Sequence, residues 1–87
     1  MKLSVVIPTL NEEECIGQVM DELSAALEGK VEYEVVVVDG MSRDRTREIA
    51  RSKGAVVVEE ARRGYGRAYK TGFAQARGEV IATMDGD

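Results

Sequence analysis

The chain alternates between short continuous apolar runs and longer stretches in which apolar side chains recur at helical spacing. Four short runs, bounded by polar residues or glycine, predict β-strands. Val35–Val38 are four consecutive valines with no polar residue between them, which is typical of a parallel strand covered by helices on both faces. The predicted strands are Leu3–Ile7, which we expect Pro8 to end, Tyr33–Val38, Ala55–Glu59 and Glu79–Met84.

The stretches between these runs predict three helices. The first has the stripe of an amphipathic helix at i, i+3, i+4, i+7 and i+11, formed by Ile16, Val19, Met20, Leu23 and Leu27. Glu12–Glu14 are expected in its first turn, where the helix dipole favours negative charge, and Gly29 at its end. The other two are expected at Arg43–Lys53, with Thr46, Ile49 and Ala50 inward and Gly54 at the end, and at Arg67–Ala76, with Ala68, Gly72, Phe73 and Ala76 buried and Gly78 as C-cap.

The predicted order is therefore β-α-β-α-β-α-β. This alternation indicates an α/β fold: a Rossmann-like parallel sheet with helices on both faces and right-handed crossovers. A length of 87 residues suits a single domain, residues 1–87, and no second domain is expected.

Composition excludes several classes of function. A net charge of −4 without histidine argues against nucleic acid as a partner of a basic surface. Cys15 is the only cysteine, so we expect a buried structural thiol in a reducing, cytoplasmic compartment rather than a disulfide or a cysteine zinc site. No apolar run approaches the roughly 20 residues needed to span a bilayer, so membrane attachment would be peripheral at most.

Candidate chemistry follows the predicted strands, because ligands of open α/β sheets bind outside the carboxyl ends of the strands. Asp39 directly follows the run of valines, and Ser42 or Asp44 can cap the next helix. Asp39 is read either as a binding residue or as a turn residue only.

Asp85-Gly86-Asp87 follows the fourth predicted strand. Two carboxylates separated by one small residue can converge on Mg²⁺ or Mn²⁺, which prefer hard oxygen ligands and often bridge to phosphates. The alternative is a pair of solvated acids. From Arg62 to Lys70 the chain carries four basic residues and no acid, so this segment is read either as a cradle for a diphosphate or as the solvated start of a helix.

The first strand is followed by PTLNEEE, which contains no glycine and three acids. A dinucleotide-binding turn or a P-loop needs glycines there so that phosphate can approach the helix N-terminus. The same loop argues against a sugar nucleotidyltransferase. A receiver-like phosphoacceptor domain is also disfavoured, because Val58-Glu59 supplies no aspartate after the third strand.

Three blocks, VVIPTLNEEE, EVVVVDGMSRDRT and RRGYGRAYKTGFAQARGEVIATMDGD, resemble the N-terminal half of family 2 glycosyltransferases with the GT-A fold. The likeness is greatest to the dolichyl-phosphate mannose synthase and polyprenyl-phosphate glycosyltransferase branch. It implies a site for a nucleotide-sugar donor, GDP-mannose or a UDP-sugar, and a lipid-phosphate acceptor. It also implies Mg²⁺ or Mn²⁺ held by Asp85 and Asp87, and donor contacts from Pro8, Leu10, Glu12, Val38, Asp39, Gly40, Arg67, Asp85, Gly86 and Asp87.

Two departures from the family pattern concern the nucleotide base. Leu10 stands where an aromatic is frequent, and Gly40 stands where a second aspartate commonly contacts the base. The choice of base is therefore open.

Length is the larger departure from the resemblance. Family members are longer, so we expect a truncated GT-A half that ends at the D-x-D motif and has little transferase activity alone, with the parent enzyme at the cytoplasmic face of a membrane. In the family's strand order, 3-2-1-4, the fourth strand is an edge, so homo-oligomers through that edge are also expected. The alternative is a non-catalytic nucleotide-binding or oligomerising remnant.

Overall fold

Within residues 1–86, which the computed structural model describes, four parallel strands form one sheet in the order β3-β2-β1-β4. The strands are β1 (Leu3–Thr9), β2 (Tyr33–Asp39), β3 (Val56–Glu59) and β4 (Val80–Thr83). They alternate with α1 (Ile16–Leu27), α2 (Thr46–Ser52) and α3 (Tyr65–Gln75). The predicted element order, parallel sheet and strand order are confirmed.

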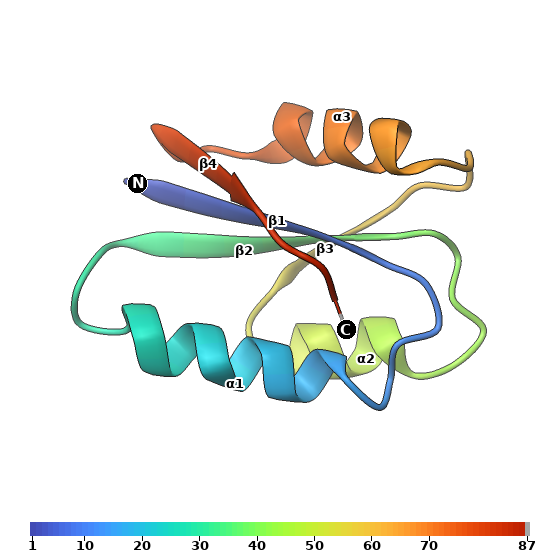
Figure 1. Cartoon of the computed structure of the whole chain (residues 1–87), viewed down its shortest axis with the longest axis horizontal. Helices are drawn as coiled ribbons and strands as arrows, with labels where there is room; N and C mark the ends of the chain where they lie inside the picture. Colours follow the sequence, from blue (N-terminus) through green and yellow to red (C-terminus); the bar gives the residue numbers. More distant parts are fainter. Residues whose placement is uncertain (87) are drawn as a thin grey trace.

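The sheet lies between two helical layers, with α1 and α2 on one face and α3 on the other (Figure 1). Alternate residues of β1 and β2 point to opposite faces of the sheet, so the run of valines packs against both helical layers. Ile7, Val35 and Val37 pack with Ile16, Val19, Met20 and Ala50 of α1 and α2. Val6, Val36 and Val38 pack with Ala68 and Tyr69 of α3.

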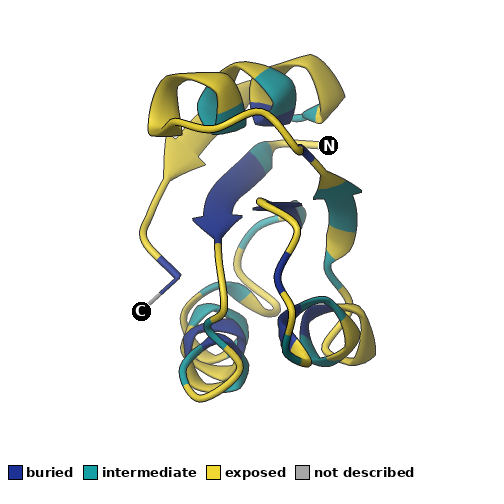
Figure 2. Ribbon diagram, turned by 90° about the vertical axis from the view of Figure 1, so that its right-hand side faces the viewer, coloured by how far each residue is buried: buried dark blue, intermediate teal, exposed yellow. Residues whose placement is uncertain are grey.

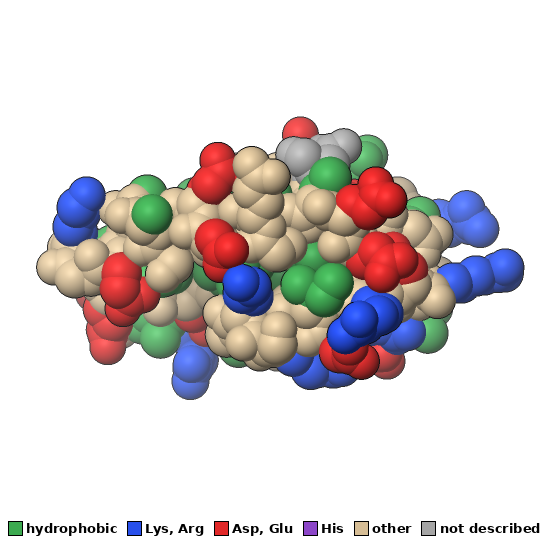
Figure 3. All heavy atoms as spheres, turned by 90° about the horizontal axis from the view of Figure 1, so that it is seen from below, with side chains coloured by type: hydrophobic (Ala, Val, Ile, Leu, Met, Phe, Trp, Pro, Cys, Tyr) green, Lys and Arg blue, Asp and Glu red, His purple; other side chains and the backbone are tan. Residues whose placement is uncertain are grey.

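The two central strands carry most of the burial, and the edge strands β3 and β4 are more exposed (Figure 2). All four residues of β4 are exposed, including Val80 at 53% and Ile81 at 41%. The outer edge of β4 has no strand partner among the described residues. On the face formed by α1 and α2, acidic and basic side chains are interspersed (Figure 3).

The prediction that Pro8 ends the first strand is wrong, because β1 continues to Thr9, with Pro8 opposite Val38 of β2. Val6 accepts a backbone hydrogen bond from Met84 on the β4 side, and Pro8, two residues on, directs its nitrogen to that same side. Pairing between β1 and β4 ends at Val6 and Thr83, before Pro8. Within residues 1–86, the sheet therefore has no hydrogen bond that would need an N–H group on Pro8.

Two predicted helix starts are also wrong. Glu12–Glu14 precede α1 instead of forming its first turn, since the backbone N–H groups of Glu12 and Glu13 donate to Thr46 and Asp44 and tie this segment to the loop before α2. Helix α2 starts at Thr46 rather than Arg43, after a turn in which Asp44 accepts the Thr46 N–H at 3.0 Å.

Helix α3 corrects two further predictions. Phe73 is 46% exposed because the inward stripe centres on Gly72, and its ring stacks on Tyr69 with centroids 6.1 Å apart. Gly78 is not the C-cap, which is Ala76. A Cβ at Gly78 would lie 2.6 Å from the Ser4 nitrogen, so this glycine permits close approach of the chain to β1.

Glu34 fastens the segment after α3 to the sheet. Its carboxylate accepts hydrogen bonds from the Ser4 hydroxyl at 2.5 Å and the Arg77 backbone N–H at 2.7 Å. Burial would raise the pKa of the Glu34 carboxyl, but these hydrogen bonds and the Arg77 guanidinium outweigh it and hold the pKa below its usual value.

Candidate functional site

A groove of about 550 Å³ lies at the carboxyl ends of β1, β2 and β3. The three loops that follow these strands and the start of α3 form it, which is the position expected for a ligand site in an open parallel sheet. Its lining comes from the end of β1 (Pro8, Thr9, Leu10, Glu12), the end of β2 (Val38, Gly40, Met41, Arg43), and the segment from β3 into α3 (Glu60, Ala61, Arg62, Arg63, Gly64, Tyr65, Ala68).

Asp39 lies beneath this groove, fully buried, and organises the loop that follows β2. One carboxylate oxygen accepts the hydroxyls of Thr9 at 2.7 Å and Ser42 at 2.5 Å. The other accepts the Ser42 backbone N–H at 2.7 Å and lies 3.5 Å from Nε of Arg47. The buried charge is therefore compensated by donors from β1, the loop and α2, as a buried carboxylate requires.

The loops after β1 and β2 are fastened to each other by side chains. The Asn11 backbone N–H donates to the Ser42 hydroxyl, and Asn11 Oδ1 accepts the Arg43 N–H, each at 2.8 Å. Asn11 adopts φ 53°, a left-handed conformation that asparagine tolerates better than most residues. These bonds fix one wall of the groove relative to the other.

The third wall is basic and is anchored by Glu60, which is only 8% exposed. Its carboxylate accepts two side-chain hydrogen bonds from Arg62, at 2.7 and 2.9 Å, and one from the Thr71 hydroxyl of α3 at 2.6 Å. The Arg62 and Thr71 hydrogen bonds lower the pKa of the Glu60 carboxyl strongly, so the group stays ionised at neutral pH.

The segment after β4 passes against the first loop. A Cβ built on Gly86 would lie 2.2 Å from Glu12 Oε2 and 3.0 Å from Thr9 Cγ2, so this buried glycine admits a close approach that a larger residue would obstruct. Asp85 is exposed. Asp87, the other predicted metal ligand, lies outside the described residues. In the described part of the chain, no three acidic or cysteine side chains gather closely enough to hold a metal ion.

The structure brings most predicted site residues to one place. Pro8, Leu10, Glu12, Val38 and Gly40 line the groove, and Gly86 adjoins it through Glu12. Asp39 supports the groove from below, and Arg67 lies in the first turn of α3 without lining it. The roles assigned to these residues stay predictions.

Sequence reasoning did not identify Thr9 and Glu60, which are buried, or Arg47, which is partly buried, as partners in this site. Thr9 could have been found, because it lies directly beside Asp39 when the first two strands are paired in parallel. Arg47 and Glu60 carry no signal that distinguishes them from neighbouring charged residues.

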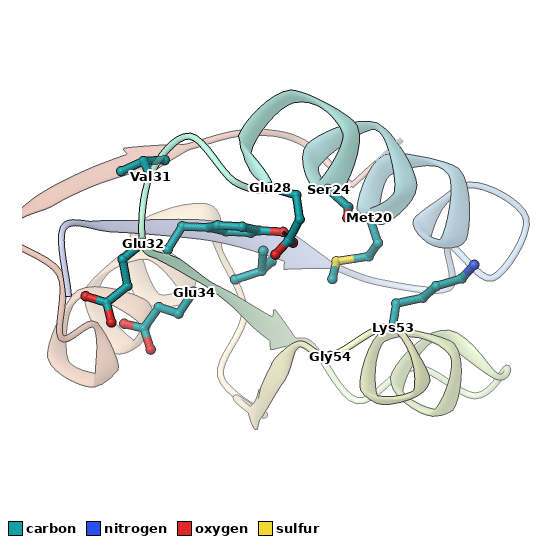
Figure 4. Close-up of a pocket in the computed structure, with 10 residues that line it drawn as sticks. Met20, Ser24, Glu28, Val31, Glu32, Glu34, Lys53 and Gly54 are labelled. Carbon is teal, nitrogen blue, oxygen red and sulfur yellow. Dashed lines mark hydrogen bonds between the residues drawn. The ribbon is translucent and has the colours of Figure 1, made fainter.

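A second hollow, of about 380 Å³, lies near the start of β2, between α1 and the end of α2. Glu32 and Glu34 lie at one end of it and Lys53 at the other (Figure 4). Lys53 donates to Asp21, and Glu34 is held by Ser4 and Arg77, so these charged groups are already paired. These paired groups give no reason to assign a ligand to this hollow.

Residues 4–87 match the family described as glycosyl transferase family 2, and the chain belongs to that family of enzymes. The chain is 51% identical over 85 residues to the low-salt glycan biosynthesis hexosyltransferase Agl6 of Haloferax volcanii, covering 98% of this chain and 21% of that protein. It is 39% identical over 92 residues to the dolichol-phosphate mannosyltransferase of Pyrococcus furiosus, covering 100% of this chain and 26% of that protein.

The fold agrees with solved structures of longer enzymes. A crystal structure of glucosyl-3-phosphoglycerate synthase from Mycobacterium tuberculosis, in complex with Mn²⁺, UDP and glucosyl-3-phosphoglycerate, superposes with a TM-score of 0.85 at 35% identity. The match covers 99% of this chain and 33% of that one. The predicted family and GT-A-type fold are thus confirmed, and the chain spans about a fifth to a third of the length of these relatives.

Among the helices of residues 1–86, none combines the length and apolar character needed to cross a membrane.

Proposed function

We propose that this chain is the donor-binding region of a metal-dependent family 2 glycosyltransferase and that a nucleotide-diphosphate sugar binds in the groove. The observation that carries the proposal is the placement of chemistry around that groove. Arg43, Arg62 and Arg63 line it, and Gly86, which follows Asp85, lies against Glu12 of that lining. Arginine guanidinium groups suit phosphate oxygens, and carboxylates suit a divalent cation that bridges to them.

The proposed metal ligands are Asp85 and Asp87. Their carboxylates are hard oxygen donors, and Gly86 between them leaves room for the chain to lie against the first loop. When bound, Mg²⁺ or Mn²⁺ would offset phosphate charge and favour departure of the nucleoside diphosphate. Crystal structures of the mycobacterial synthase contain UDP with Mn²⁺ in one case and with Mg²⁺ in another.

The acceptor is proposed to be a polyprenyl or dolichyl phosphate, and the donor GDP-mannose or a UDP-sugar. The names of two relatives, dolichyl-phosphate hexose transferase of Haloferax volcanii and dolichol-phosphate mannosyltransferase of Pyrococcus furiosus, support the acceptor. UDP in the mycobacterial synthase supports a UDP-sugar. Because the relatives are several times longer, we expect little sugar transfer from the 87 residues alone.

The test is calorimetric titration of the chain with UDP, GDP, UDP-glucose and GDP-mannose, with and without Mn²⁺. We expect Mn²⁺ to tighten binding of one nucleotide series, and Asp85→Ala to weaken binding in Mn²⁺ at least tenfold, about 1.4 kcal/mol. Asp21→Ala is the matched control, because Asp21 pairs with Lys53 far along α1. A folded chain that binds no nucleotide, or equal weakening by both variants, would contradict the proposal.

A further inference from the structure

Glu60 is a buried acid at the groove to which the proposed function gives no task. Its position is fixed by its own backbone, since the Glu60 N–H donates to the Asp39 carbonyl at 2.8 Å. Its side chain is fixed from α3 by Thr71. Glu60 is therefore held by its backbone at the end of β2 and by its carboxylate at α3, which are the floor and one wall of the groove.

Glu60 in turn fixes Arg62. Glu60 Oε1 accepts from Nη2 at 2.7 Å, and Oε2 accepts from Nε and from the Arg62 backbone N–H, both at 2.9 Å. This is a two-point fork that sets the plane of the guanidinium as well as its position. Arginine has five N–H donors, so three remain for another acceptor.

Those remaining donors are accessible, because the Arg62 side chain is 64% exposed while the Glu60 side chain is 9% exposed. Both residues line the groove. A free arginine loses rotamer entropy when it orders around a ligand, and an arginine already held in place loses less.

The ion pair also predicts how Arg62 contributes to the binding of a phosphate group. Paired with Glu60, Arg62 adds little net charge, so it attracts a phosphate less at long range than an unpaired arginine does. Its contribution lies in directed hydrogen bonds at contact, for which the guanidinium plane must be correct. Arg63 has no ion pair within residues 1–86 and lines the same groove, so it is the natural contrast.

We propose that Arg62 contacts the diphosphate of the bound donor and that Glu60 is the positioning residue that presents its guanidinium. This inference rests on the proposed function and adds a contact and its support to it. Binding should therefore depend on Glu60 only through Arg62, and the two residues should behave as one unit.

The experiment is a double-mutant cycle on the 87-residue chain with Glu60→Gln, Arg62→Met and both together. The ligand is UDP or GDP, whichever binds the wild type more tightly in Mn²⁺. We expect each single variant to weaken binding about tenfold and the double variant to bind within twofold of the weaker single variant. The loss in Glu60→Gln should vary little between 50 and 300 mM salt, whereas Arg63→Met should weaken binding mainly at low salt.

Two control variants separate positioning from folding. Glu59→Gln removes the adjacent acid, which pairs with Arg47 instead, and should bind within twofold of the wild type. Thr71→Val removes the tie to α3 but leaves the fork, so it should weaken binding less than Glu60→Gln does. Nitrogen-15 spectra should show a slowly exchanging Arg62 Nε–H in the wild type and its loss in Glu60→Gln.

Unchanged binding in Glu60→Gln or Arg62→Met, or additive losses in the double variant, would overturn the inference while leaving the proposed function intact. A loss in Thr71→Val equal to that in Glu60→Gln would show that Glu60 acts through the fold rather than through Arg62. Wild-type chain that is folded and binds neither nucleotide would refute the proposed function, and this inference with it.

Discussion

Within residues 1–86, three carboxylates are buried, those of Glu34, Asp39 and Glu60, and each accepts hydrogen bonds from at least two segments. Each therefore fastens parts of the chain that are distant in sequence. Asp39 and Glu60 do so at the groove, and Glu34 does so at the other end of the sheet, where it holds Arg77. For Glu34 and Glu60, whose hydrogen bonds lower the pKa of the carboxyl group, this stabilisation is lost when the carboxylate is protonated.

Glu34 gives a prediction about pH. Its pKa is lower in the folded state than in the unfolded chain, so its contribution is fully present above the unfolded pKa and is lost as the pH falls through the folded pKa. We expect the free energy of unfolding to fall less steeply below about pH 4.5 in Glu34→Gln than in the wild type. Urea denaturation from pH 7 to pH 3 measures this.

The control for that series is Glu22→Gln, which removes the same charge from an exposed position of α1. It should keep the wild-type dependence of stability on pH. If the free energy of unfolding depends on pH in the same way in wild type and Glu34→Gln, then Ser4 and Arg77 do not stabilise the ionised carboxylate of Glu34.

The sequence predicted candidate residues whose position follows from the order of strands and helices. It did not predict residues whose importance depends on which side chains they contact in the fold. Asp39 was found because it follows a buried run and must stand at a strand end. Glu60 was not, because it follows Glu59 directly and only the fold shows that one turns to Arg62 and the other to Arg47. Patterns along a chain do not encode partners that arrive from another element.

At the scale of elements, α3 packs on the sheet through a glycine. A Cβ on Gly72 would lie 2.3 Å from Val6 Cγ1 and 3.1 Å from Val38 Cγ2, and both valines are buried in the sheet. Helical spacing predicted Gly72 and Phe73 together as buried. The structure shows that the close approach at Gly72 turns Phe73 outward, and spacing alone does not resolve that difference.

We expect Gly72→Ala to destabilise the chain by about 1–3 kcal/mol, although alanine is the better helix former, because the new methyl group overpacks the interface with Val6. Gly66→Ala in the same helix is the matched control. Apart from its chain neighbours and the backbone of its own helix, no atom of residues 1–86 lies within 4 Å of its Cβ position, so stability should rise by up to about 1 kcal/mol. Thermal unfolding of both variants tests this, and equal effects would exclude the packing explanation.

At the scale of the whole molecule, the strand order β3-β2-β1-β4 is the one expected from the family resemblance. Periodicity predicted that four strands and three helices exist, but not which strands are neighbours. It also gave helix starts that were too early, because the loops before α1 and α2 are held by bonds between them rather than by their own sequence.

The exposed edge of β4 gives a prediction about assembly. Val80 and Ile81 are exposed there, next to backbone groups that have no strand partner within residues 1–86. We expect reversible self-association through this edge, which Ile81→Lys should suppress, since an edge lysine discourages strand pairing. Sedimentation between 10 µM and 1 mM would show it.

Lys70→Ile, which adds an apolar residue on α3 away from the strand edge, is the control for general hydrophobicity. A monomer at every concentration, in wild type and control alike, would rule this assembly out.

The central place of β1 has a consequence for how the protein is made. β1 pairs with β2 on one side and with β4 on the other, and β4 is synthesised after the other three strands. The nascent chain can pair β1, β2 and β3 and bury the core beneath α1 and α2 while one flank of β1 is still open. Since ribosomes add about 5–20 residues per second, that flank stays available to chaperones for seconds before β4 covers it.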